Sequence, residues 1–489
     1  MATTLLTKKL PLDVIWEILS HLAAPKARTG TDIEPYSTHP HPVPWELALI
    51  DRAWRECAVH SGDLWTRIHV GYYQYPADAL VQLEVQLRRC GTKLLDVTLA
   101  NDDPFSVLQD SPALLASCPR WETLRLLLDD PFFTVEFDST EGDFEALRRL
   151  EILCTFACES TEDVPEIPDV SNTPNLSELI LTDSEFECIS PNVTLDWEQI
   201  THLRVFCDSP GTLYDTARAA SNLVELGLRI QLPDADNATA PAIAVFPRLK
   251  RLYVHAADWL NFLRAPALRD LTCRASRLRP LINFTFRSKI SNSLRTLILT
   301  GFSDSREGLA KLMDVFSGLT KLAVQDARLP GLGPAWETPF YLFSGLKAVP
   351  NNIGVLPCPQ LEAFIYSCLV APSEDMEAFF DMVKTRIGSA DRKEGEEGER
   401  CLRYVRYFWG INPYPERSSY EEDVRNLRSG GLDIELTQSG LNAFDEITRG
   451  WLEDREEEEG ADEDEEEEEG YDEEEDVDSE EEEEEEESD

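Results

Sequence analysis

Residues 294–299 read LRTLIL, and this pattern of apolar residues, spaced three apart and then two apart, recurs along the chain. Alternate side chains of a strand lie on one face, so the last two apolar positions of each copy point the same way. Ten copies begin 19 to 29 residues apart. Their apolar positions are Leu94-Val97-Leu99, Trp121-Leu124-Leu126, Leu147-Leu150-Ile152, Leu176-Leu179-Leu181, Ile200-Leu203-Val205, Leu223-Leu226-Leu228, Leu249-Leu252-Val254, Leu268-Leu271-Cys273, Leu294-Leu297-Leu299 and Leu319-Leu322-Val324.

The spacing of these copies is typical of leucine-rich repeats. One such unit cannot bury its apolar face alone, whereas stacked units can, so a curved solenoid is predicted. Helical return segments are expected between strands, for example residues 78–89. The fold class is therefore predicted to be α/β, with a leucine-rich-repeat solenoid over residues 76–452. The asparagine common after the strand of such repeats is missing, with Ser184, Asp208, Gln231 and Ala257 in its place, which predicts an irregular horseshoe.

After Val324 the period lengthens. Two further strands are predicted at 361–366 and 402–407, with a helix lined by Met376, Phe379, Phe380, Val383 and Ile387 between them. The charged stretch 388–400, GSADRKEGEEGER, is predicted to be a mobile insertion. A last strand over 432–436 and a helix over 441–451 are expected to cap the array.

The N-terminal region has a different pattern. LPLDVIWEILSHL, residues 10–22, places apolar side chains at steps of three and four, which predicts an amphipathic helix opened by Pro11. Proline-rich residues 23–44 are predicted to be a loop insertion. A second helix is expected from Trp45, with Leu47, Ile50, Trp54 and Ala58 on one face. A turn, SGDLW, then leads to Trp65.

These stretches, LPLDVIWEILSHL, LALIDRAWRECA and SGDLWTRI, resemble an F-box of the divergent type common in mushroom-forming fungi. The resemblance covers residues 8–70 and implies three short helices that bind the adaptor Skp1. Two features depart from the family pattern: the long loop, and Asp51 where a small or apolar residue usually precedes the arginine. The alternative is a helical cap that shields the first repeat. By position, the resemblance implies that Leu10, Pro11, Val14, Ile15 and Ile18 face Skp1, and that Trp54 and Trp65 hold the module together.

Charge is distributed very unevenly along the sequence. The formal net charge is -48, and residues 453–489 hold 29 acidic residues against Arg455 alone. Such a segment has too little apolar area to offset the entropy of ordering, so a disordered polyacidic tail is predicted. Three roles remain open for it: solubilisation, attraction of a basic partner such as a histone or ribosomal protein, or contact with basic stretches of the solenoid. The rest of the chain is also acidic, which argues against direct binding of nucleic acid.

No catalytic or cofactor motif is recognisable, so no enzyme, cofactor or metal site is expected. His39 and His41, and the close pair Cys154 and Cys158, are the nearest approach to ligand sets, and they are interpreted as loop and core residues. The eleven scattered cysteines are expected to be reduced. Signal-peptide and membrane-span patterns are missing from the sequence, so a cytoplasmic or nuclear location without membrane contact is expected.

The resemblance implies a substrate-recognition adaptor of an SCF-type (Skp1–cullin–F-box) ubiquitin ligase. The F-box would bind a Skp1-like adaptor and, through it, a cullin, while the repeats would bind an unknown protein target. The alternative is a leucine-rich-repeat scaffold or chaperone outside the ubiquitin system that uses the acidic tail to bind basic proteins. Outward positions at the strands are the candidate target-binding residues: Glu178, Arg204, Glu225, Arg251 and Arg295.

Overall fold

The computed structural model describes the greater part of the repeat array and of the N-terminal region. Four predicted features lie outside the described residues: most of the 23–44 loop, the 388–400 insertion, the 441–451 helix and the 453–489 tail. The described ranges are 10–23, 42–70, 77–100, 111–128, 144–154, 173–183, 195–206, 210–229, 243–275, 277–302, 312–313, 315–326, 342–343, 345–347, 357–368, 373–387, 402–409 and 418–438.

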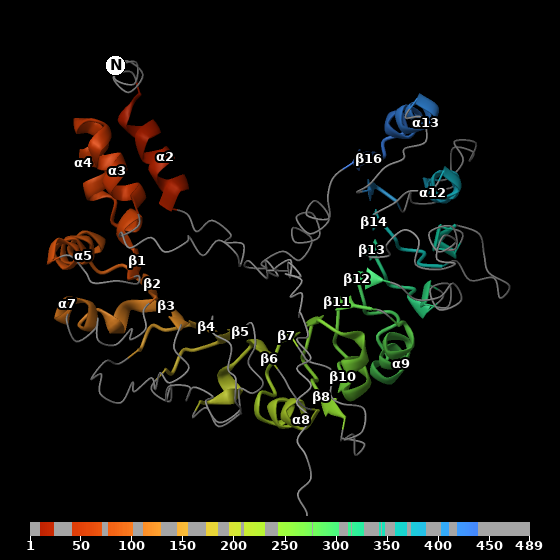
Figure 1. Ribbon diagram of the computed structural model, residues 1–489, viewed down its shortest axis with the longest axis horizontal. Helices are drawn as coiled ribbons and strands as arrows, with labels where there is room; N and C mark the ends of the chain where they lie inside the picture. The colour runs from red at the N-terminus through yellow and green to blue at the C-terminus, as the bar shows by residue number, and fades with distance from the viewer. Residues whose placement is uncertain are drawn as a thin grey trace, which may run out of the picture.

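Fourteen strands form one parallel sheet, and each strand pairs with the next along the chain apart from β8 and β10, which form a separate two-stranded sheet. The sheet is curved, and Figure 1 shows it following the inner side of an arc. The bounds are β1 (Arg67–Val70), β2 (Leu95–Ala100), β3 (Trp121–Leu128), β4 (Arg149–Cys154), β5 (Glu178–Asp183), β6 (His202–Phe206), β7 (Glu225–Arg229), β8 (Ala244–Val245), β9 (Arg251–Val254), β10 (Leu263–Arg264), β11 (Asp270–Arg274), β12 (Thr296–Phe302), β13 (Lys321–Asp326), β14 (Ala363–Cys368), β15 (Tyr404–Trp409) and β16 (Asp433–Gln438).

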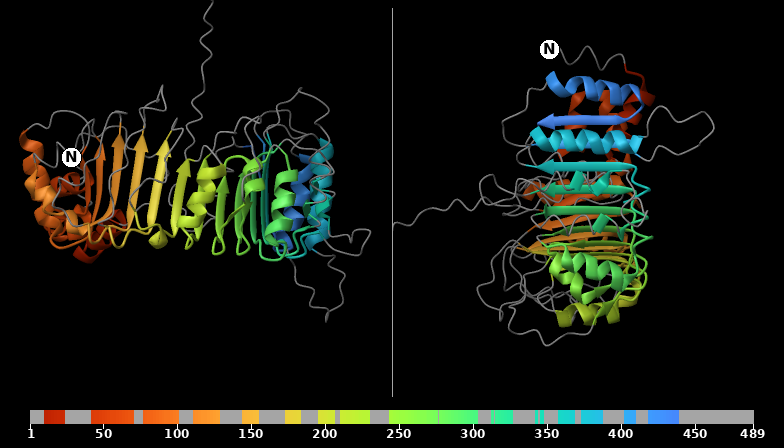
Figure 2. Two further views of the ribbon diagram at one scale, coloured as in Figure 1. Left: turned by 90° about the horizontal axis from the view of Figure 1, so that it is seen from below. Right: turned by 90° about the vertical axis from the view of Figure 1, so that its right-hand side faces the viewer.

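The helices of the array lie on the outer side of the arc, and all strands point the same way in Figure 2. These helices are α5 (Ala77–Cys90), α7 (Pro112–Leu115), η2 (Cys118–Arg120), η4 (Trp197–Gln199), α8 (Pro210–Ala219), η5 (Ala257–Phe262), α9 (Arg279–Ser288), α12 (Ser373–Ile387) and α13 (Ser418–Ser429). Four more lie together at the N-terminal end: α2 (Leu12–Ala23), α3 (Pro42–Ile50), α4 (Arg52–His60) and η1 (Gly62–Trp65). The molecule is thus a mixed α/β protein with a large parallel sheet.

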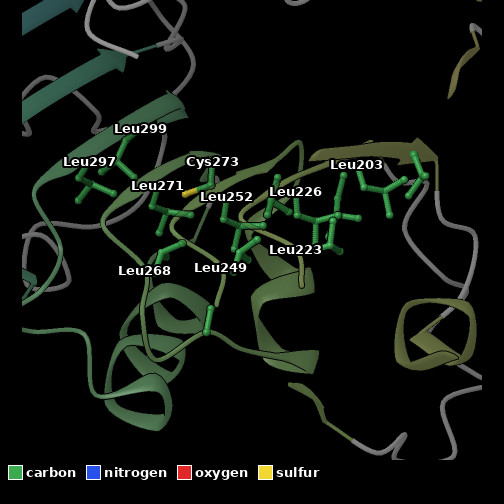
Figure 3. Close-up of a cluster of buried hydrophobic side chains, with 14 of the residues drawn as sticks. Leu203, Leu223, Leu226, Leu249, Leu252, Leu268, Leu271, Cys273, Leu297 and Leu299 are labelled. Atoms are coloured by element: carbon green, nitrogen blue, oxygen red, sulfur yellow. The ribbon is translucent and has the colours of Figure 1, made fainter. Parts of the chain in front are cut away.

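The core lies between the sheet and the outer helices, and it is built from the positions that the sequence pattern selects. Leucines of successive strands stack side by side (Figure 3), and the apolar positions of all ten copies are buried apart from Leu94. Leu94 is 43% exposed because the register between β2 and β3 shifts at Leu95, which is buried in its place. Each leucine removed from water in this way contributes about 1.5–3 kcal/mol.

Aromatic side chains pack against one another in the core behind the last strands of the sheet. Phe343 lies 5.2 Å from Tyr366 and 5.5 Å from Phe379 between ring centroids, and Phe379 lies 5.0 Å from Tyr407. The strands β14, β15 and β16 and the helix α12 confirm the three strands and the helix between them that were predicted after Val324. On α12, Met376, Phe379, Phe380 and Val383 are buried as expected, and Ile387 is half-buried.

Polar side chains tie together the turns that lead into the strands. Ser293 Oγ donates to the carbonyl of Leu268, and Thr320 Oγ1 donates to that of Arg295, at 3.1 Å in both cases. A Cβ on Gly318 would lie 2.2 Å from the carbonyl oxygen of Asn292, so only glycine fits this turn. These contacts keep the starts of neighbouring strands in line.

Candidate interaction surfaces

The first candidate surface is the apolar side of helix α2, which is wider than its contact with the rest of the chain. Ile15 and Leu19 are fully buried and form the centre of the apolar stripe. On one flank, Val14 is 37% exposed; on the other, Leu12 is 57% and Trp16 is 40% exposed. Residues four apart share a helix face, so Ile15 and Leu19 lie between these two flanks. The helix thus uses only the middle of its stripe for its own core.

The residues predicted to face Skp1 are therefore not equivalent. Leu10, at 36% exposure, Pro11 and Val14 lie at the surface, as the resemblance implies. Ile18 is half-buried and packs against the core. Ile15 is fully buried within this chain, so its assignment as a partner-facing residue is wrong. It points inward because it lies one residue on from Val14, about 100° around the helix.

Helix α3 adds two apolar residues that the sequence interpretation did not place at the surface. Leu49 is 77% exposed and Ile50 is 44% exposed. The predicted single helix from Trp45 is in fact two helices, since Asp51 has φ -159 and accepts hydrogen bonds from the backbone N–H of Ala53 and Trp54. Asp51 is thus an N-cap that ends one helix and starts the next. Because of this break, Ile50 does not share the buried face of Trp54 and Ala58.

Trp54 and Trp65 lie in the core of the N-terminal helices, in agreement with the interpretation of the sequence. Trp65 is fully buried, and its Nε1 donates to the carbonyl of Ala58 at 2.7 Å. Trp45 meets Trp65 edge to face, with 5.0 Å between ring centroids.

The N-terminal helices are joined firmly to the sheet, through contacts that sequence reasoning missed. The Arg89 guanidinium, on α5, lies 4.3 Å from the ring centroid of Trp65 and 4.9 Å from that of Trp45. Burial lowers the pKa of Arg89, and the aromatic faces favour its cation. From the same helix, Gln86 Nε2 donates to the carbonyl of Arg67 at 2.6 Å. Contacts between residues far apart in sequence carry no periodic signal that could have revealed them.

The second candidate surface is the inner face of the sheet, the side opposite the buried leucines. Its first half is crossed by ion pairs. Arg125 on β3 reaches Asp96 at 3.4 Å and Glu151 at 2.6 Å, between nitrogen and oxygen atoms. Arg149 bonds the same Glu151 at 2.5 Å and reaches Glu178 on β5 at 3.5 Å. The chain of charges thus links four neighbouring strands.

A second group of charges follows on β6, β7 and β9. Glu225 accepts from Arg204 at 3.3 Å and from Arg251 at 3.2 Å. Four of the five candidate target-binding residues, Glu178, Arg204, Glu225 and Arg251, therefore pair with other strands. A target that used them would have to compete with these contacts. Arg295 differs. It directly precedes β12, on the side of the sheet where the strands begin, and its side chain donates to the carbonyl of Gly318 at 3.0 Å.

Glu151 is the acid at the centre of the first group. Burial would raise the pKa of Glu151, but the charges and hydrogen bonds of Arg125 and Arg149 outweigh it and hold the pKa below its usual value. The carboxylate is therefore ionised at neutral pH.

Further along the arc, the inner face carries an apolar cluster that the repeat pattern did not predict. Ile298, Ala323, Ile365 and Phe408 form a buried cluster separate from the main core, with half-buried Tyr404 against it. Ile298, Ala323 and Ile365 are consecutive partners in the register of β12, β13 and β14. The same face thus changes along the arc from paired charges to apolar side chains, and charges return on β15 and β16, where Arg406 pairs with Asp433 and Glu435 at 3.0 Å in both cases.

Reactive side chains give no alternative site among the residues that the structure describes. No three His, Cys, Asp or Glu side chains are grouped there as metal ligands would be. Burial raises the pKa of the Cys118 and Cys273 thiols to about 12, so both are protonated at neutral pH. Cys154 lies in β4, and Cys158, His39 and His41 lie outside the described residues. None of the described helices combines the length and apolar character needed to cross a bilayer.

No family model matches this chain, and a search of curated proteins gives no significant match.

Proposed function

We propose that this chain is a non-enzymatic substrate-recognition adaptor of an SCF-type ubiquitin ligase. In this proposal residues 8–70 are an F-box-like module that binds a Skp1-like adaptor and, through it, a cullin. The parallel array is a leucine-rich-repeat solenoid that binds a protein target. The chain itself supplies no chemistry; it raises the effective concentration of the target near the ubiquitin-loaded partner.

The exposed apolar flank of α2 carries this proposal. A helix that served only as a cap would need one apolar stripe, the one that Ile15 and Leu19 occupy. Leu10 and Val14 on one flank of that stripe, and Leu12 on the other, are exposed at the end of the arc, where a partner has access. Burial of such side chains in a groove of another protein is a common way of recognising a helix.

The join at Arg89 supports the same function. An adaptor that positions a target is most effective when its two binding surfaces keep a fixed separation. The buried side chains from Ile15 on α2 to Ile434 on β16 belong to one continuous cluster. The Skp1-facing helices and the array would therefore move as one body.

Co-purification with Skp1 tests the proposal on the full-length chain. Leu10→Asp combined with Val14→Asp should weaken the complex by about 100-fold, since two apolar contacts of about 1.5 kcal/mol each are lost. The melting temperature should stay unchanged, because both side chains are exposed. Ile15→Asp is unsuitable, since it would place a charge in this chain's own core.

Phe286→Asp is the matched control, because Phe286 is an exposed apolar side chain of α9, far from the N-terminal helices. It should leave Skp1 binding intact. If the wild-type chain fails to retain Skp1, the ligase proposal is wrong, and retention of basic proteins would favour the scaffold instead.

A further inference from the structure

One segment of the sheet is strongly basic in an otherwise acidic protein. Residues 243–302 hold eleven Lys and Arg residues but only two acidic ones, Asp258 and Asp270. Nine of the eleven basic side chains are exposed. Repulsion between like charges disfavours such a concentration unless something offsets it. The exposed ones are Arg248, Lys250, Arg264, Arg269, Arg274, Arg277, Arg279, Lys289 and Arg295.

Three of these residues occupy equivalent places on neighbouring strands. Lys250, Arg269 and Arg295 each directly precede a strand, namely β9, β11 and β12. The backbone N–H of Arg269 donates to the carbonyl of Lys250 at 2.8 Å, and that of Arg295 donates to Arg269. Neighbouring strands lie about 4.8 Å apart. We call these three residues the basic row.

No acid alternates with the bases of the basic row. The flanking residues in the same ladder are Val224, which accepts from Lys250, and Thr320, which donates to Arg295. Among the described residues, none of the three is ion-paired with a carboxylate, and the nearest acid in sequence, Asp270, begins β11. The inner face differs, because Glu225 there lies between Arg204 and Arg251. Three adjacent cations without an acid between them repel one another and attract an extended anion.

We propose that the basic row binds the chain's own acidic segment, residues 453–489. This inference does not depend on the ligase proposal. The segment offers 29 carboxylates against a single base, Arg455, so its charge complements the basic row along its whole length. A bound tail would keep other anionic proteins away from this edge until it is displaced.

The connecting chain is long enough for this contact. Residues 439–452 separate the end of β16 from Glu453. From β16 to the start of β12 the path is four strand spacings, about 19 Å, and one strand length, about 20 Å. With residues 441–451 helical, as the sequence predicts, this linker spans about 26 Å, and ten extended residues of the acidic segment add about 33 Å. A tether of this length gives an effective concentration on the order of millimolar, which favours the tail over an untethered competitor.

Carbodiimide cross-linking of the full chain tests the proposal, because it joins a lysine amine to a carboxylate in contact with it. Lys93, an exposed lysine that precedes β2 at the same edge of the sheet, pairs with Asp63 at 2.9 Å, so the comparison is made in an Asp63→Asn background. We expect Lys250 to link to residues 453–489 about ten-fold more than Lys93. The link should decline between 0.1 and 1 M NaCl, as the Debye length falls from about 10 Å to about 3 Å.

Charge reversal gives the matched comparison. Arg269→Glu with Arg295→Glu should reduce the Lys250 link about ten-fold. Arg277→Glu with Arg279→Glu, the same charge change beyond the opposite ends of the strands, should leave it within about two-fold. If the first pair unfolds the protein, Arg269→Gln with Arg295→Gln should still lower the link. Equal linking of Lys250 and Lys93, or links only between isotopically distinct copies, would overturn the proposal.

Discussion

The ion-paired region of the inner face, on β2 to β9, and its apolar cluster, on β12 to β15, share one backbone geometry but differ in their side-chain contacts. Ile180 on β5 and Ile365 on β14 belong to the same register row, which passes through Arg204, Gly227, Tyr253, Thr272, Ile298 and Ala323. Ile180 is half-buried beside ion pairs, whereas Ile365 is fully buried in an apolar cluster. The side chains on the inner face thus determine, strand by strand, whether that face is charged or apolar. The leucines on the opposite, core-facing side are buried in both regions.

A substitution in the apolar cluster should destabilise the protein most. Ile365→Ala should lower the free energy of unfolding by about 2–5 kcal/mol, because it leaves a cavity among buried side chains. Ile180→Ala, in the same register row, should cost about 1 kcal/mol, since its side chain is partly in water. Urea unfolding followed by circular dichroism gives both values. Equal losses would show that the two regions do not differ in packing.

A smaller effect is expected from the acid that joins the charges of the ion-paired region. Glu151→Gln should lower the free energy of unfolding by about 1–3 kcal/mol at pH 7, because Arg125 and Arg149 lose their shared carboxylate. The folded pKa of Glu151 is lowered, so its contribution is present above the unfolded value of about 4.3 and disappears as pH falls through the folded pKa. Unfolding measured from pH 7 down to pH 3 should show the two proteins converging. A constant difference would contradict the proposed charge pairing.

The smallest effect is expected for Arg251, whose side chain is 26% exposed. Arg251→Met keeps most of the apolar stem and removes one of the two ion pairs of Glu225. The expected loss is about 0.2–1 kcal/mol, and it should shrink further in 1 M NaCl. Arg204→Met should cost more, because that side chain is only 12% exposed. The melting temperatures of both variants at low and high salt show which substitution destabilises the protein more.

Much of the array could be predicted because burial in it is periodic. The leucines of β6 or β12 are buried wherever the neighbouring units also stack. Each copy of the motif therefore predicts which of its own residues are buried. The N-terminal helices were predicted less well. Ile15 and Val14 are adjacent apolar residues of one stripe, and the sequence does not show which one the rest of the chain covers. Asp51, a departure from the family pattern, has a local role as a helix cap.

Composition and short-range periodicity are sufficient to locate the repeating strands, their inward residues, and the basic segment and acidic tail, because each of these is a local property of the chain. Three facts are visible only in the folded chain: four candidate target-binding residues form ion pairs with other strands, Arg89 joins the N-terminal helices to the array, and Lys250, Arg269 and Arg295 lie next to one another. Those contacts join residues some 20 or more positions apart. Their proximity follows from the stacking of strands, which no local pattern encodes.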